Sequence, residues 1–280
     1  MKKIALVTDS TVDFTPELVE EHEVHIIPLK VLFGTQEYFD GEITSEEFYQ
    51  RLGEEKELPK TSQPSPEAFS KVYSKLLEEY QEIISIHISS ELSGTLNSAR
   101  LAAERIKAKI HLIDTKTISL GVGMMMIEAS NYIKEGLESV HILEKLAKLR
   151  TNVETVFTLN TLEYLQKGGR IGRVQGIMGQ FFNIKPIIRV GDDGIYHTLG
   201  KARSQEKALN NMVESFKQLG KGRKCVRLGV AHGAALEAGL YLKEAMENAF
   251  EMPSTIFTQV GPVIGVHTGP GTIGAAVQYE

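Results

Sequence analysis

The sequence contains a single cysteine, Cys225, among its 280 residues. One thiol cannot form an intramolecular disulfide framework, and it cannot supply the thiolates of a zinc site. No apolar run approaches the ~20 residues of a membrane-spanning helix. The apolar run after Lys3 extends only from Ile4 to Val7, too short for the core of a signal peptide. We therefore expect a protein of a reducing cytoplasm with no integral membrane segment.

An excess of basic residues is also missing. The chain has 31 Lys and Arg against 36 Asp and Glu, so its formal net charge is -5, and its pI is near 6.0. Proteins that neutralise nucleic-acid phosphates carry basic surfaces, and a recognisable helix for reading bases is not apparent either. The sequence therefore argues against a nucleic-acid partner.

Composition and periodicity indicate an α/β protein of two domains. The residues are 42% hydrophobic and 24% charged, as in ordinary globular proteins. In the first half, strand-like runs at 3–8, 24–32, 83–89 and 110–113 alternate with helical patterns at 16–21, 66–80 and 96–107. This rhythm predicts a mostly parallel sheet. Helical patterns at 119–134 and 141–149 follow.

The second half has strand candidates at 155–159, 184–190, 195–201, 226–231 and 255–259, with helices at 205–219 and 234–250. We predict a mixed sheet here. The boundary is placed near residue 151, which gives domains 1–150 and 151–280. Because no repeat or long linker separates them, we expect a ligand cleft between the two domains.

A cluster of hydroxyls lies where the strand at 83–89 gives way to a helix. Ser93, Gly94 and Thr95 flank the expected helix start. A helix N-terminus has unpaired N–H groups and a partial positive charge, which suits an anion. Ser93 can equally be a plain helix cap, and the spacing alone does not decide.

A second pair of hydroxyls, Thr61 and Ser62, precedes the helix at 66–80. Ser65 fits its N-cap and Pro66 its first turn. Those assignments give Thr61 and Ser62 no task beyond local turn bonding. A ligand role for Thr61 therefore stays open.

The segment LEYLQKGGRIGR (162–173) places Arg170 among glycines, where cations and N–H groups can approach a negative group closely. A solvated basic loop would have the same composition. Near the C-terminus, Gly269, Gly271 and Gly274 match the dinucleotide pattern G-x-G-x-x-G, but too few residues follow for the helix and acidic residue that the pattern requires.

In this C-terminal glycine-rich segment, His267 is the remaining candidate site residue, and we expect it in a glycine-rich turn between apolar strands. Asp9 and Ser10 follow the first strand, where ligands bind in open α/β sheets. Either residue can equally cap the first helix.

Six segments together closely resemble the DegV family. They are VTDST (7–11), KTSQPSP (60–66), SSELSGTLNSA (89–99), LEYLQKGGRIGR (162–173), KPII (185–188) and GPVIGVHTGPGTIG (261–274). The resemblance implies two α/β domains with a lipid-binding tunnel between them. It also implies a non-catalytic protein that binds a long-chain fatty acid such as palmitate, needs no cofactor or metal, and presents the carboxylate to a separate ATP-dependent kinase chain. The acyl phosphate would serve phospholipid synthesis, with transient membrane-surface contact for acyl exchange.

By the same resemblance, Thr61, Ser93 and the N–H of Gly94 would bind the carboxylate. Arg170 and His267 would lie at the same polar end. Ser62, Asp9 and Ser10 are secondary candidates. Arg203 would lie on the surface that docks the kinase.

Two other functions stay open at this point. A serine hydrolase would use Ser93 and His267 with an acid such as Asp9, although nothing around Ser93 matches G-x-S-x-G. A binding module for a phosphorylated metabolite would use the helix start at Ser93 with Arg170 and Arg173. That module would leave an apolar tunnel without a purpose.

Overall fold

The first half of the chain is built on a parallel sheet of four strands in the order β2-β1-β6-β7. The computed structural model describes residues 2–55, 57–177 and 184–280. The strands are β1 (Lys2–Asp9), β2 (Val24–Ile27), β6 (Tyr80–His87) and β7 (Lys109–Asp114). The predicted parallel sheet is therefore confirmed. Because β1 and β6 are neighbours, their carboxyl ends lie together at a point where the strand order reverses, which favours a ligand site.

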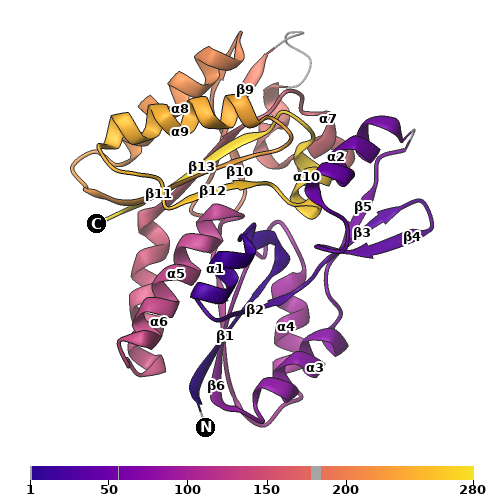
Figure 1. Ribbon diagram of the computed structural model, residues 1–280, viewed down its shortest axis with the longest axis vertical. Coiled ribbons are helices and arrows are strands. Elements are labelled where there is room, and N and C mark those ends of the chain that lie inside the picture. Colours follow the sequence, from indigo (N-terminus) through magenta and orange to yellow (C-terminus); the bar gives the residue numbers. More distant parts are fainter. Residues whose placement is uncertain (1, 56, 178–183) are drawn as a thin grey trace.

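Helices cover both faces of this sheet (Figure 1). They are α1 (Pro16–Glu21), α5 (Leu120–Lys134) and α6 (Ser139–Leu149) on one side, and α3 (Pro66–Leu76) and α4 (Thr95–Ala103) on the other. Alternate residues of β1 explain the two layers, since Ile4 and Leu6 pack into the α5 and α6 layer while Ala5 and Val7 pack into the α3 and α4 layer.

A side-chain cap marks where helix α3 begins. The Ser65 hydroxyl accepts a hydrogen bond from the Ala68 N–H at 3.2 Å, and Pro66 occupies the first turn of α3 as predicted. Helix α1 has the predicted bounds. Helices α3 and α4 end earlier than the patterns indicate, at Leu76 and Ala103.

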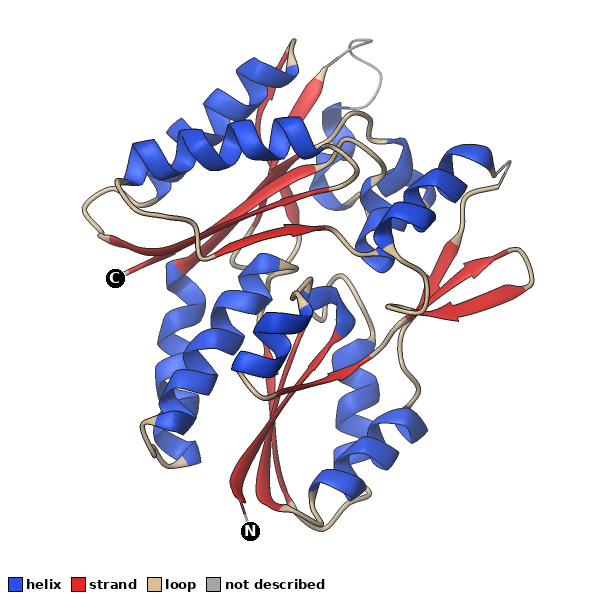
Figure 2. Cartoon of the chain, viewed as in Figure 1, coloured by secondary structure: helices blue, strands red, loops and turns tan. Residues whose placement is uncertain are grey.

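The second half has a mixed sheet of six strands in the order β10-β9-β8-β13-β11-β12, as predicted. Its strands are β8 (Val153–Thr158), β9 (Lys185–Val190), β10 (Tyr196–Ala202), β11 (Cys225–His232), β12 (Ile256–Gln259) and β13 (Ile273–Tyr279). Helices α8 (Gln205–Leu219) and α9 (Leu236–Phe250) cover its outer face, and its other face is turned toward the first half (Figure 2). The sequence patterns did not predict β13.

A small antiparallel sheet, β4-β3-β5, corrects one prediction. The run predicted as one strand over 24–32 is two strands in two sheets, because β2 ends at Ile27 and β3 (Lys30–Phe33) pairs with β4 (Gln36–Phe39) and β5 (Lys60–Ser62). Pro28 lies at the break and has no N–H to continue a ladder. Helix α2 (Ser45–Glu54), also not predicted, follows β4.

The two sheets meet over a shared apolar cluster. Ile88, Leu92 and Ile118 from the first half pack with residues such as Phe157 and Tyr196 from the second half. The domain boundary predicted near residue 151 falls between α6 and β8 and stays a prediction. Within the described ranges, every helix is too short or too polar to span a bilayer.

Candidate functional site

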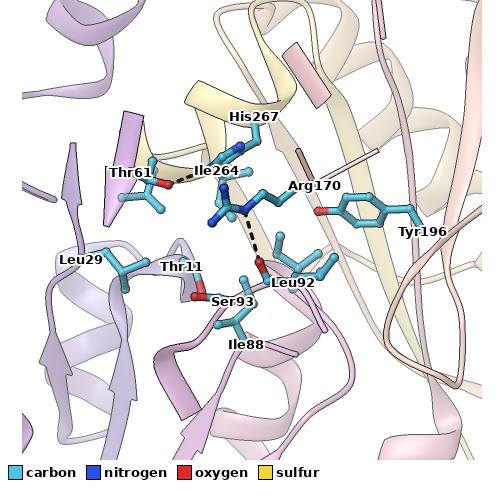
Figure 3. A pocket seen from close by; sticks show the side chains of 12 residues that line it. Thr11, Leu29, Thr61, Ile88, Leu92, Ser93, Arg170, Tyr196, Ile264 and His267 are labelled. Atoms are coloured by element: carbon cyan, nitrogen blue, oxygen red, sulfur yellow. Dashed lines mark hydrogen bonds between the residues drawn. The ribbon is translucent and has the colours of Figure 1, made fainter. Parts of the chain in front are cut away.

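A pocket between the two halves gathers most of the predicted site residues (Figure 3). The space between its atoms, open mouth included, is about 390 Å³. Its lining residues are Thr11, Leu29, Thr61, Ile88, Leu92, Ser93, Ile118, Arg170, Tyr196, Val263, Ile264 and His267. Thr61, Ser93, Arg170 and His267 therefore share one pocket. Its floor lies beside the carboxyl ends of β1 and β6.

Thr61 and His267 are brought together by two elements that the sequence patterns missed. Thr61 lies on β5, where it pairs with Val31 of β3. His267 lies on helix α10 (Pro262–Thr268), not in a turn between strands as predicted. The Thr61 Oγ1 and His267 Nε2 atoms are 2.8 Å apart. The small antiparallel sheet thus positions Thr61 in the pocket, and helix α10 positions the His267 imidazole beside it.

His267 is neutral at physiological pH. Burial, together with the nearby positive charge of Arg170, lowers the pKa of its imidazole to about 4. Its Nδ1 atom is buried without a hydrogen-bond partner among the described residues. Burying a ring nitrogen that lacks a hydrogen-bond partner costs less free energy when the nitrogen is an acceptor than when it carries a hydrogen. We therefore assign the proton to Nε2, which then donates to Thr61. The Thr61 hydroxyl keeps its own hydrogen for a ligand.

Gly168 explains one of the glycines in the basic loop. A Cβ at this position would lie 2.3 Å from His267 Nδ1 and 2.9 Å from the Tyr164 carbonyl oxygen. Only a residue without a side chain lets the loop pack this closely against the imidazole. The glycine-rich segment is therefore shaped by contact with α10, and not only by solvent exposure.

Ser93 precedes the N-cap of α4, which is Gly94. The Ser93 hydroxyl accepts from the Thr95 N–H at 3.3 Å and lies 2.8 Å from the Thr95 hydroxyl. When Thr95 donates in that pair, the Ser93 hydrogen is free to bind a ligand in the pocket. Gly94 is outside the lining set, and a Cβ there would meet the Gln63 side chain at 2.4 Å.

Arg170 extends across the pocket between the two halves (Figure 3). Its Nη1 donates to the Gly168 carbonyl at 2.8 Å, and its Nε donates to the Leu92 carbonyl at 3.4 Å. The guanidinium is the one charged group in the lining set and is largely exposed. It supplies positive charge beside the hydroxyls and also ties the 168–173 loop to the first half.

Tyr196, which the sequence reasoning missed, adds another donor. Its side chain is 2% exposed, and its hydroxyl points toward Arg170 (Figure 3). No other described residue forms a hydrogen bond with this hydroxyl. Burial raises the pKa of Tyr196 above its ordinary value, so the hydroxyl stays protonated. A tyrosine in a strand gives no sequence signal beyond β propensity.

The secondary candidates lie outside the pocket lining. Both Asp9 oxygens accept hydrogen bonds, from Thr11, His87 Nδ1 and the Ile88 N–H. The Ser10 hydroxyl accepts from the Leu29 N–H at 3.1 Å. Ser62 is exposed on β5. In the described structure, Asp9 and Ser10 therefore serve the local fold.

The hydrolase alternative is wrong in its choice of residues. Ser93 bonds to Thr95, His267 bonds to Thr61, and Asp9 bonds to His87, so the proposed triad is not assembled. A serine, histidine and aspartate array does occur at Ser85, His87 and Asp9, with contacts of 2.7 and 2.8 Å. Its side chains are fully buried, and Ser85 also bonds to Tyr73. This array stabilises the core beneath the pocket.

A second hollow adjoins the first. It encloses about 380 Å³ between its atoms, mouth included, and shares Ile118 and Ile264 with the polar pocket. Its other lining residues are mostly apolar or small: Ser119, Leu120, Thr155, Phe157, Ala231, Val260, Thr272, Gly274 and Ala275. The two hollows together place a polar end beside an apolar one.

Two further observations complete the site. The described residues contain no cluster of three or more His, Cys, Asp or Glu side chains that could hold a metal ion. Arg203 is exposed between β10 and α8 and has no ion-pair partner in the part of the chain that the structure describes.

Comparisons with known proteins agree with this fold. The model of the family described as "Uncharacterised protein, DegV family" matches residues 3–280. A DegV domain-containing protein of Clostridium acetobutylicum is 38% identical, with complete coverage of both chains. A structure described as fatty acid binding of a DegV family protein from Thermus thermophilus has a TM-score of 0.94 and 37% identity, and covers 99% of this chain and 100% of its own. A stearic acid-binding protein from Eubacterium ventriosum has a TM-score of 0.91 and 30% identity over 100% of this chain and 98% of its own.

Proposed function

Because this chain belongs to the DegV family, we propose that it binds a long-chain fatty acid between its two halves. The carboxylate would accept hydrogen bonds from Thr61, Ser93 and Tyr196 beside Arg170. The acyl chain would pass Ile118 and Ile264 into the second hollow. The observation that carries the proposal is that a pocket with hydroxyls and a cation adjoins a mostly apolar hollow, with Ile118 and Ile264 lining both.

The energetics suit this ligand. A hydrogen bond to a charged group contributes roughly 1.5 to 3 kcal/mol, so three hydroxyls can offset much of the desolvation of a carboxylate. Each buried methylene adds about 0.8 kcal/mol. The tail therefore supplies most of the affinity, and the polar end fixes which way the chain points. A phosphorylated metabolite would leave the second hollow without a function.

We further propose that the protein carries the acyl group and does not transform it. Ser93 has no histidine base within hydrogen-bond distance among the described residues, so the site lacks an activated nucleophile. The carboxylate would instead be presented to a separate cytoplasmic kinase chain that uses ATP. Arg203 is a candidate contact because it is exposed and carries an unpaired charge.

Mass spectrometry of lipid extracted from the freshly expressed protein tests the binding proposal. We expect a near-stoichiometric long-chain fatty acid in the wild type and a depleted one in Thr61→Ala and Ser93→Ala. Ser62→Ala is the matched control, because Ser62 lies next to Thr61 on β5 but is exposed. An empty wild-type protein, or one that holds a polar phosphate, contradicts the proposal.

The kinase step has its own test. With a purified bacterial fatty-acid kinase and ATP, Arg203→Glu is expected to slow acyl phosphate formation while fatty-acid binding stays unchanged. Lys207→Glu, a charge reversal in the first turn of α8, is the control. Equal rates for the wild type and Arg203→Glu would remove Arg203 from the docking surface.

A further inference from the structure

The second hollow contains hydroxyls that an unsubstituted acyl chain does not need. Ser119, Thr155 and Thr272 are the hydroxyl residues in its lining. The Ser119 hydroxyl donates to Asp13, and the Thr272 hydroxyl donates to the carbonyls of Thr268 and Gly269. Those two hydrogens are therefore committed to protein acceptors.

Thr155 differs from the other two. Its Oγ1 lies 2.9 Å from the Oγ1 of Thr117, and this is the one hydrogen bond that either hydroxyl makes with described residues. Both side chains are more than nine-tenths buried, with exposures of 6% and 5%. The two hydroxyls carry two hydrogens, but the hydrogen bond between them takes up only one of these hydrogens. One O–H hydrogen is therefore left without an acceptor.

The position of the pair determines where that hydrogen can find an acceptor. Thr155 lines the second hollow and Thr117 does not. Gly121 packs against the pair so closely that a Cβ there would lie 2.4 Å from the Thr117 oxygen and 2.5 Å from the Thr155 oxygen, which leaves no room for an acceptor on that side. When Thr117 donates to Thr155, the Thr155 hydrogen can point into the hollow. An acceptor atom on a ligand would select that arrangement.

The chemistry of the acceptor can be stated more narrowly. A hydroxyl on the acyl chain would accept from Thr155 but would bring a further hydrogen with no acceptor of its own. A carbonyl oxygen accepts without adding a donor, so it leaves every hydrogen of the trio paired. We infer that Thr155 is a specificity-determining residue whose hydroxyl donates to a carbonyl oxygen on the distal part of a bound acyl chain, so that the site accepts oxo fatty acids. This inference rests on the proposed fatty-acid-binding function.

The test compares affinities of the lipid-free protein for octadecanoic acid and for oxo-octadecanoic acids with the carbonyl at successive positions along the distal half. The measured quantity is the affinity for the oxo acid divided by the affinity for the plain acid. For one position of the carbonyl, or for two adjacent positions, the ratio should be about fivefold lower in Thr155→Val than in the wild type. This substitution removes the hydroxyl and keeps the branched shape of the side chain. Thr158→Val is the control, because Thr158 is a buried threonine of the same strand outside the cavity lining.

Thr117→Val separates ligand binding from a merely structural role. This variant also breaks the pair, but it leaves the Thr155 hydrogen free, so the ratio should be kept or raised. A parallel fall in Thr117→Val and Thr155→Val would mean that the pair only supports the fold, and would overturn the inference. A ratio that Thr155→Val leaves unchanged at every position would overturn it as well.

The outcome for the plain acid keeps the two proposals distinguishable. If octadecanoic acid binds but no oxo position depends on Thr155, the inference fails and fatty-acid binding stands. If no fatty acid binds at all, the proposed function fails, and the inference fails with it.

Discussion

Neutral hydroxyls, and not several cations, surround the expected carboxylate. In the described part of the chain, Thr61, Ser93 and Tyr196 each hold a hydrogen that no protein acceptor requires, and Arg170 is the one charged residue among the described lining residues. A dense cationic site would favour phosphates over carboxylates and would hold the ligand more firmly through charge. The arrangement observed suits a ligand held mainly by its tail, with a carboxylate that stays available for reaction.

His267 gives a prediction at this scale. Its pKa of about 4 lies below the ordinary value of 6.5 because of burial and the charge of Arg170. Replacing Arg170 with Gln removes the second cause and should raise the pKa of His267, as measured by NMR titration of the imidazole. Binding of a carboxylate should raise the pKa of His267 as well, since a negative charge favours the protonated ring.

The same shift fixes the sign of a stability effect. Between pH 6.5 and about 4 the unfolded chain binds a proton at His267 that the folded chain does not, so stability falls as the pH falls through this window. The pH dependence of the melting temperature should be shallower there in His267→Gln. Identical slopes in this variant and the wild type would show that the imidazole is not held neutral.

Tyr196 carries a second residue-scale prediction. Tyr196→Phe keeps the buried ring and removes the hydroxyl, so fatty-acid affinity should fall by at least about tenfold, the effect of one hydrogen bond to a charged group. Isothermal titration with a fatty acid measures the change. Tyr241→Phe, whose hydroxyl binds Asn210 at the surface, should bind as the wild type does. An unchanged affinity in Tyr196→Phe would remove this residue from the site.

The sequence identified some of these side chains and not others for physical reasons. Thr61, Ser93 and Arg170 stood out because hydroxyls or a cation lay beside helix starts or glycines without a local task. Tyr196 gave no such signal, since an aromatic residue in a strand usually packs in a core. The sequence alone does not reveal the contact of Asp9 with His87, because His87 is distant in sequence and meets Asp9 only through the pairing of neighbouring strands.

At the scale of elements, the sequence patterns predicted most strands and helices, and small residues hid two of the elements that the patterns missed. Strand β13 reads IGAAVQY, in which Gly and Ala lower the β propensity. Helix α10 contains Gly265, a poor helix former, because a Cβ there would lie 2.5 Å from the Phe48 ring. Both elements line the hollows, and their small residues weaken the sequence signal: Gly274 and Ala275 line the second hollow, whereas Gly265 makes room for Phe48.

The start of α10 gives a prediction for this scale. The Gly261 N–H donates to Asp13 at 2.9 Å, and the Ser119 hydroxyl donates to the same carboxylate. Burial raises the pKa of Asp13 from 3.8 to about 7, with nearby Asp40 and Asp9 adding to the shift, although both hydrogen bonds oppose it. Because the folded pKa is the higher one, stability contributed by protonation is lost as the pH rises toward 7.

Asp13→Asn tests this effect with little change of shape. Asn is tolerated at the positive φ of 52° that Asp13 adopts. Its Oδ1 can still accept from the Gly261 N–H, while its Nδ2 can donate to the Ser119 hydroxyl, which is able to accept. The melting temperature of this variant should fall less between pH 5 and 8 than that of the wild type. Asp192→Asn, at an exposed turn, should follow the wild type. Parallel curves for all three proteins would contradict the assigned cause.

For the whole molecule, the mixed sheet would limit the length of the proposed ligand. Gly274 of β13 pairs with Ala231 of β11, and both line the second hollow. A Cβ at Gly274 would meet nothing nearer than 3.5 Å, so Gly274→Ala should be tolerated. Gly274→Leu fills the space and should shift the bound lipids to shorter chains, as measured by mass spectrometry of extracted lipid. An unchanged chain-length profile would mean that the tail follows another path.

The position of the hollows could not be predicted from sequence, because they depend on how two separately recognisable α/β halves pack. Ile118 and Ile264 are ordinary apolar residues in their own segments, yet in the folded protein both of them line the first pocket and the second hollow. A crystal structure of the protein with octadecanoic acid tests the central claim most directly. The account predicts the carboxylate within hydrogen-bond distance of Thr61, Ser93 and Tyr196, with the chain running past Ile118 and Ile264 toward Gly274. A fatty acid bound elsewhere, or one in the reverse orientation, would contradict it.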